Sequence, residues 1–144
     1  GCTVGLVQHH FGSKDGLRVA VEDEIFDYLT TALAGGPGDV AAREARVHAM
    51  LAFHPEVTDY LRRALLDRPG ESGMLSRIVA LSRAEVATMR KSGTIKATRS
   101  EQEQVVHLLV RQFGVLFLDP MVAAVWEEME QPVDSRPELR VTLK

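Results

Sequence analysis

Helical periodicity runs along almost the whole chain, and it limits the possible folds more than any other feature. In the first long segment, apolar side chains recur at intervals of three or four residues: Leu17, Ala20, Val21, Ile25, Tyr28 and Leu29. This spacing places them on one face of an amphipathic helix. The alternation of apolar and polar residues that is typical of β-strands is almost absent. The sequence therefore predicts an all-α fold.

Proline, glycine and capping residues divide this pattern into separate helices. The predicted helices span residues 4–10, 14–33, 40–53, 56–66, 73–92, 101–118 and 121–130. Ser13 is a suitable N-cap for the second of them, and Ser100 with Glu103 matches a capping box. Gly93 is a natural stop for the helix that precedes it.

Two segments and one internal proline are expected to interrupt the helices. Residues 34–39 are rich in glycine and proline, which predicts a loop. Pro120 is expected to break or kink the most apolar helix, because proline removes a backbone donor and clashes with the preceding turn. Residues 132–144 contain two prolines and no periodic pattern, so we expect a mobile tail there.

The composition is that of one ordinary globular domain. The chain has 144 residues, of which 45% are hydrophobic and 26% are charged, and its net charge is −3. This charge excludes a chain-wide polycation that coats nucleic acid, although a local basic face remains possible. The single cysteine, Cys2, cannot form an intrachain disulfide, and the N-terminus lacks a signal-peptide pattern; both favour a cytoplasmic location. The most apolar region, residues 105–126, is interrupted by polar residues, so no membrane-spanning helix is predicted.

The most specific pattern lies at the N-terminus, where residues 1–17 read GCTVGLVQHHFGSKDGL. This stretch resembles the second half of the helix-turn-helix of TetR-family transcriptional regulators, whose pattern runs roughly G-V-S-x-G-T-L-Y-x-H-F-x-S-K-x-x-L. The positions that match are Gly1, Gly5, His10, Phe11, Ser13, Lys14 and Leu17. Thr3 and Val7 are close replacements, whereas Leu6 and Gln8 depart from the usual residues.

The resemblance implies that the N-terminal segment reads double-stranded DNA. The implied DNA-binding residues are Thr3, Val4, Gly5, Leu6, Gln8, His9, His10 and Lys14. The first residues of a recognition helix face base edges, and the N-terminus of the next helix attracts a phosphate. In the family, two helices precede this segment. They are absent from this polypeptide, so we expect it to bind an operator poorly or not at all by itself.

The resemblance also implies a division into two parts. Residues 1–33 would hold the end of the helix-turn-helix and a connecting helix, and residues 34–144 would form a helical effector-binding and dimerisation domain. A small, mostly apolar effector is expected among the middle helices. The candidate pocket residues are Met50, Phe53, Tyr60, Met74, Ile78, Leu81, His107, Phe113 and Phe117. The alternative is that these side chains simply fill a core.

The last two predicted helices carry more apolar surface than one small core requires. Gly114 lies in the middle of a helix at a cost of about 1 kcal/mol relative to alanine, which a close helix–helix approach would explain. The candidate dimer interface comprises Arg111, Gly114, Leu118, Met121, Val122, Val125 and Trp126. The resemblance implies a homodimer that matches a palindromic operator, with repression that the effector relieves. Burial of these residues within one chain is the alternative.

Two other function classes compete with a regulator. Five histidines, and Glu44 four residues before His48, are compatible with a metal site, but no HExxH or CxxC motif is present. We therefore predict no enzyme activity, no metal and no cofactor. The second alternative is a helical dimerisation or ligand-binding module that does not bind DNA.

Overall fold

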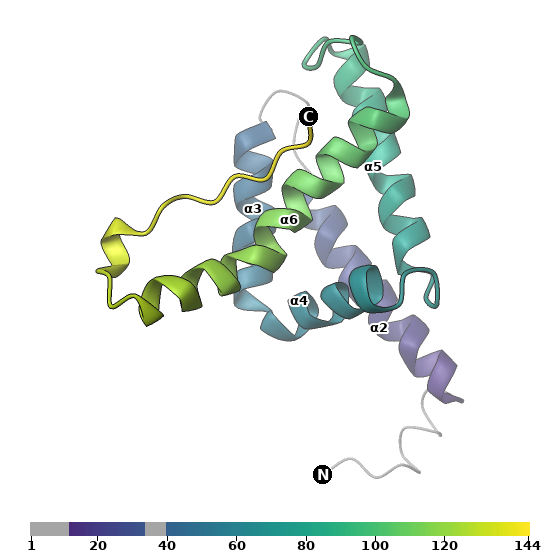
Figure 1. Ribbon diagram of the computed structural model, residues 1–144. Helices are drawn as coiled ribbons and strands as arrows, with labels where there is room; N and C mark the ends of the chain where they lie inside the picture. Colours follow the sequence, from purple (N-terminus) through teal and green to yellow (C-terminus); the bar gives the residue numbers. More distant parts are fainter. Residues whose placement is uncertain (1–11, 34–39) are drawn as a thin grey trace.

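The computed structural model describes residues 12–33 and 40–144, and these form an all-α fold (Figure 1). Its helices are α2 (Lys14–Leu33), α3 (Val40–Phe53), α4 (Pro55–Arg62), α5 (Met74–Lys91) and α6 (Glu101–Glu128). A π-helical turn, Arg63–Asp67, extends α4, and a 3₁₀ turn, Val133–Ser135, follows α6. No strand occurs in the described residues, which confirms the predicted fold class. The helix expected at 4–10 and the loop expected at 34–39 lie outside them.

Helix α2 has the predicted limits but a different buried face. The Ser13 hydroxyl accepts a hydrogen bond from the Gly16 N–H at 3.0 Å, as expected for an N-cap. The buried side chains are Glu22, Ile25, Leu29 and Ala32. The expectation that Val21 and Tyr28 face inward is wrong, because Val21 is 40% exposed and Tyr28 is also exposed. Glu22 faces inward instead, and its carboxylate accepts a hydrogen bond from the Tyr60 hydroxyl.

Local signals place the other helix boundaries as expected, with one exception. Pro55 begins α4, Gly93 ends α5 with a φ of +73°, and the Ser100–Glu103 capping box begins α6. The exception is Pro120, which does not break α6 into two helices. A proline removes only one backbone donor, and a bend relieves its clash with the preceding turn. Accordingly α6 bends toward its C-terminal end (Figure 1).

The continuity of α6 bears on the expectation that the chain has no membrane-spanning helix. The uninterrupted helix Glu101–Glu128 is long and apolar enough, by length and composition alone, to cross a membrane. No membrane-spanning helix was expected there, because polar residues and Pro120 interrupt the apolar region. The core helix of a soluble protein meets the same criterion, so α6 carries no further argument about location.

Two apolar clusters hold the described helices together. The larger one joins α2, α3, α4 and α5, and its most completely buried members are Leu51, Leu61 and Met74. A smaller one at the far end of α5 and the start of α6 contains Val86, Met89, Val105 and Leu108. Because the second half of α2 contributes to the larger cluster, the helix that connects the two predicted parts is packed into the body of the protein.

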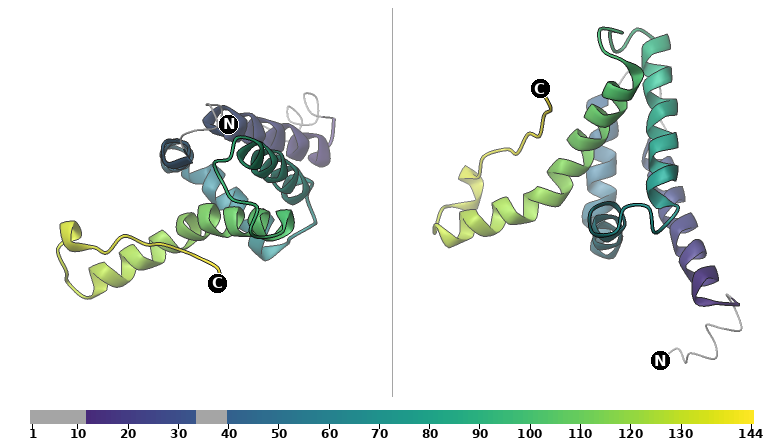
Figure 2. Two further views of the ribbon diagram at one scale, coloured as in Figure 1. Left: turned by 90° about the horizontal axis from the view of Figure 1, so that it is seen from above. Right: turned by 45° about the vertical axis from the view of Figure 1, so that its right-hand side comes forward.

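The C-terminal segment, residues 136–144, runs back along α6 (Figures 1 and 2). It has no regular secondary structure, as its sequence predicts, but it has a defined place. Val141 lies against Gly114, where an added Cβ would be 3.0 Å from the nearest Val141 methyl carbon. The close approach at Gly114 is therefore made by this segment and not by a second helix.

Candidate functional site

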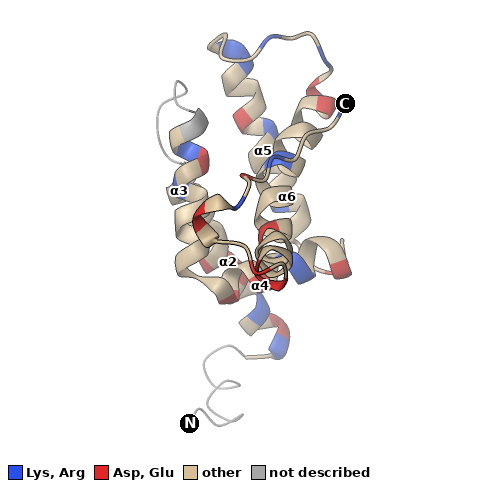
Figure 3. Cartoon of the chain, turned by 60° about the vertical axis from the view of Figure 1, so that its left-hand side comes forward, with Lys and Arg blue, Asp and Glu red and all other residues tan. Residues whose placement is uncertain are grey.

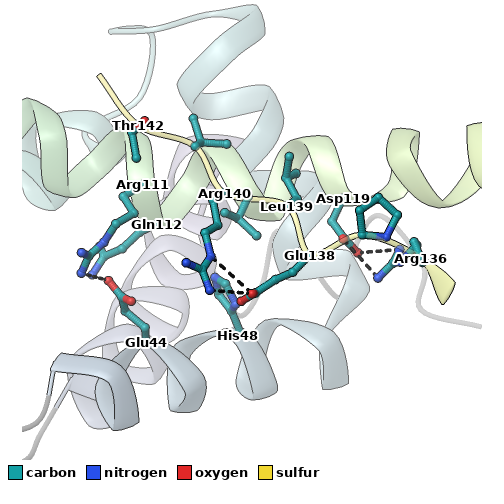
Figure 4. Close-up of a pocket in the computed structure, with 13 residues that line it drawn as sticks. Glu44, His48, Arg111, Gln112, Asp119, Arg136, Glu138, Leu139, Arg140 and Thr142 are labelled. Carbon is teal, nitrogen blue, oxygen red and sulfur yellow. Dashed lines mark hydrogen bonds and ion pairs between the residues drawn. The ribbon is translucent and has the colours of Figure 1, made fainter. Parts of the chain in front are cut away.

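A cavity of about 730 Å³ lies between α3, α6 and the C-terminal segment (Figure 4). Its volume is within the range of small-molecule sites, roughly 300–1,000 Å³. Helix α3 contributes Glu44 and His48, and α6 contributes residues between Arg111 and Asp119. Residues 136–142 of the C-terminal segment form the remaining wall. We call this space the polar cavity, because charged side chains dominate its lining.

Three ion pairs lie along the polar cavity. Arg111 of α6 pairs with Glu44 of α3. Arg136 pairs with Asp119 at 3.2 Å and so attaches the C-terminal segment to α6. Arg140 pairs with Glu138 at 2.8 Å within that segment. Figure 4 shows the three pairs spaced along the cavity, with the His48 side chain pointing from α3 toward the segment.

A second cavity of about 580 Å³ is lined by α5, the loop that follows it, α6 and the end of the C-terminal segment. It shares Arg111, Val141 and Thr142 with the polar cavity. His107 lines it, and the Arg99 guanidinium donates to the His107 ring at 2.5 Å from Nε2. Because a guanidinium can only donate, the ring nitrogen that it meets is an acceptor.

A buried ion pair joins α3 to α5 beside the polar cavity. Arg43 and Glu85 are hydrogen-bonded to each other, and both side chains are almost completely buried. The Nε and Nη2 atoms of Arg43 have no hydrogen-bond partner. Burial raises the pKa of the Glu85 carboxyl, and the neighbouring Arg43 charge opposes that shift. Sequence reasoning did not find this pair, because nothing in the local pattern marks Arg43 as inward-facing.

A second buried polar contact joins α2 to α4. The Tyr60 hydroxyl donates to Glu22 Oε1 at 2.5 Å, and Glu22 is only 4% exposed. Burial, followed by this hydrogen bond, raises the pKa of Tyr60 to about 12. Tyr60 thus remains a neutral donor to a carboxylate over the whole physiological range.

The Tyr60 pKa gives a direct test of this contact. In a Tyr28→Phe variant, Tyr60 is the remaining tyrosine, so its ionisation can be followed by ultraviolet absorbance. We expect a midpoint near pH 12 in the folded protein. Since the folded pKa is raised above the ordinary value of about 10, the associated stability is complete below about pH 10 and disappears as the pH rises to 12. A midpoint near 10 while the protein is still folded would show that the contact is absent.

The predicted DNA-binding residues cannot be placed, apart from Lys14. Thr3, Val4, Gly5, Leu6, Gln8, His9 and His10 lie outside the described residues. Lys14 begins α2 and is exposed. In the view of Figure 3, basic and acidic positions alternate along the described helices.

The predicted pocket residues lie mostly together, but as packed core. Six of them belong to the larger apolar cluster or pack against it: Met50, Tyr60, Met74, Ile78, Phe113 and Phe117. Leu81 is half-buried, and His107 lines the second cavity. The expectation that Phe53 faces inward is wrong, because it is 83% exposed at the end of α3. The C-terminal segment instead lines both cavities. Its sequence has no periodic pattern from which this position could be predicted.

The predicted dimer residues fall into two groups. Leu118, Met121 and Val125 are exposed, and Val122 and Trp126 are half-buried. Arg111 and Gly114 instead make their contacts within the chain, with α3 and with the C-terminal segment. The Trp126 indole also has an internal partner, because it donates to the Pro132 carbonyl at 2.9 Å.

Compared with known proteins, the chain matches no family model, no curated protein and no solved structure. The likeness to TetR-family regulators thus depends on residues 1–17 alone, and it stays a prediction. Among the described residues, no group of three or more metal-ligating side chains comes together.

Proposed function

We propose that this chain functions in a ligand-responsive DNA-binding regulator that acts as a homodimer. The observation that carries the proposal is the resemblance of residues 1–17 to part of a helix-turn-helix. The exposed N-terminal half of α2, which directly follows this segment, agrees with it. No residue from Ser13 to Val21 is buried, and the first buried residue is Glu22. Helix α2 therefore projects from the helical body at its N-terminal end (Figure 1), as a helix that carries a DNA-reading segment would.

The C-terminal half of α6 supports the homodimer. It extends beyond the other helices (Figure 2), and Leu118, Met121, Val125 and Met129 are exposed along it. Their spacing of three, four and four residues gives one apolar stripe, which we call the α6 stripe. An exposed apolar stripe of this kind is typical of an interface. A two-fold arrangement of α6 stripes would place two N-terminal segments on the half-sites of a palindromic operator.

Helix α2 would transmit the effector signal. Arg77 of α5 donates to Asp23 at 2.7 Å and stacks its guanidinium on Phe26, 4.3 Å from the ring centre. A change in the packing of the middle helices would thus tilt α2 and move the two readers out of register with the DNA. An apolar effector bound among the predicted pocket residues would have to open a core that is closed in this structure. Such a ligand acts only if its affinity differs between the two states.

The α6 stripe can be tested with one charge. In a protein that carries a complete helix-turn-helix ahead of this chain, we expect Met121→Glu to convert a dimer into a monomer, because Met121 is 58% exposed in the single chain and would be covered in the dimer. Sedimentation velocity measures the mass, and a gel shift with DNA from the region upstream of its own gene measures operator binding. Both should be lost. The control Ala87→Glu adds the same charge to an exposed position of α5 and should change neither.

The outcomes separate the proposed function from its alternatives. A monomeric wild-type protein, or a Met121→Glu variant that remains dimeric, would contradict the interface. A dimer that shifts no DNA at low salt would favour a dimerisation or ligand-binding module without DNA binding.

A further inference from the structure

We propose that the polar cavity is a binding site for a small zwitterion, that is, an α-amino acid or a short peptide with free termini. This inference is independent of DNA binding. It concerns a different place from the apolar pocket predicted between the middle helices. It depends on three features: the paired charges of the lining, the weak attachment of the C-terminal segment, and the free polar groups that the segment offers.

The charges of the lining select a ligand with both signs. Each guanidinium along the cavity already has a carboxylate partner: Arg111 with Glu44, Arg136 with Asp119, and Arg140 with Glu138. An anion that binds one guanidinium displaces its carboxylate and leaves that charge without its partner, so the number of ion pairs in the cavity does not increase. A cation has the same effect on the guanidinium. A zwitterion avoids both costs, because its carboxylate and its ammonium can satisfy the two separated partners.

The Arg140–Glu138 pair is the one best placed to exchange in this way. Arg140 is 80% exposed at its side chain and Glu138 is 76% exposed, so their pair contributes little to stability. A ligand can therefore separate them at small cost. His48 faces the same part of the cavity from α3 and adds a polar ring to its lining.

The C-terminal segment is attached in a way that permits entry. Residues 137–144 make no backbone–backbone hydrogen bond to any other described residue. The contacts between the segment and α6 include the Arg136–Asp119 ion pair and the packing of Val141 on Gly114. Its backbone N–H and C=O groups are therefore not engaged by the backbone of another described element, and they can bind the polar ends of a peptide or amino acid. The segment can close over such a ligand without losing any hydrogen bond of its own backbone.

Binding can be measured on the full chain without DNA. The probes are the twenty α-amino acids and pooled dipeptides, screened by thermal shift, because a ligand of the native state raises the melting temperature. For each hit, calorimetry compares the free compound with its N-acetylated form and its C-terminal amide. Each derivative lacks one charge, and we expect each to bind at least about tenfold more weakly.

Two variants locate the site. Arg140→Ala removes an exposed cation of the cavity and should weaken the hit by about tenfold or more. The matched control, Arg68→Ala, removes the cation of another exposed Arg–Glu pair, with Glu71 at 3.2 Å, far from the cavity, and should have no effect. Gly114→Leu puts a large side chain where Val141 packs, so it should displace the C-terminal segment and weaken binding in the same way.

Several results would overturn the proposal. It fails if no amino acid or dipeptide binds at millimolar concentration. It also fails if singly charged derivatives bind as well as the parent compound, or if Arg140→Ala binds like the wild type. Loss of operator binding in the dimer experiment would leave the proposal standing, because these measurements contain no DNA.

Discussion

Leu61→Ala is expected to destabilise the fold by about 3 kcal/mol or more, a large share of the total stability of a domain of this size. Leu61 is 0% exposed and lies on α4, where the larger apolar cluster brings together α2, α3 and α5. Truncation removes apolar contacts and leaves a cavity that surrounding helices fill only in part. Denaturant unfolding followed by circular dichroism measures the loss of stability as a lower transition midpoint.

Leu66→Ala is the matched control for this prediction. The same substitution five residues later, in the π-helical turn, removes a side chain that is 57% exposed. We expect a change within about 0.5 kcal/mol there. Equal losses for the two variants would mean that α4 does not pack as described.

The buried Arg43–Glu85 pair should give the other large effect. Arg43→Met or Glu85→Leu alone is expected to cost about 3–5 kcal/mol, because each leaves a buried charge without its partner. The double variant should recover most of this loss and reach or exceed wild-type stability. Replacing a buried pair with apolar residues of similar volume is often neutral or stabilising. The two unpartnered nitrogens of Arg43 add to the cost of keeping the pair, which favours the same outcome.

The pH dependence of these variants identifies Glu85 as the group responsible. Burial raises the pKa of Glu85, and Arg43→Met removes the charge that opposes this shift. The folded variant then binds a proton more tightly than the unfolded chain does. Its stability should therefore rise as the pH falls from neutral toward the ordinary carboxyl value of about 4.5.

Two carboxylates with lowered pKa values would give the opposite pH dependence. The pKa values of Glu56 and Glu103 are lowered by hydrogen bonds to backbone groups, so their stabilisation is lost only as the pH falls below the ordinary value. The double variant lacks both charges and should show no rise. A single variant as stable as the double one, or a rise in both, would contradict the proposed pairing.

Much of the fold is encoded in short-range signals, and those predictions were the accurate ones. The limits of α2 and α3, the Ser100–Glu103 capping box and the stop at Gly93 all follow from contacts within a few residues. Pro120 was expected to break or kink the helix, and of these two outcomes the break does not occur, because α6 continues through the proline. The candidate sites were harder to predict, because their residues come from separate elements.

The sequence by itself determined which segments are helical, because caps, prolines and apolar periodicity act over one or two turns. It also supplied the N-terminal pattern on which the proposed DNA binding depends. Only the tertiary structure decided that Glu22 faces inward in place of Val21, that Arg43 is buried against Glu85, and that Val141 covers Gly114. Each of these depends on what a distant part of the chain brings to the same place. An irregular segment such as residues 136–144 carries no periodicity from which that place could be predicted.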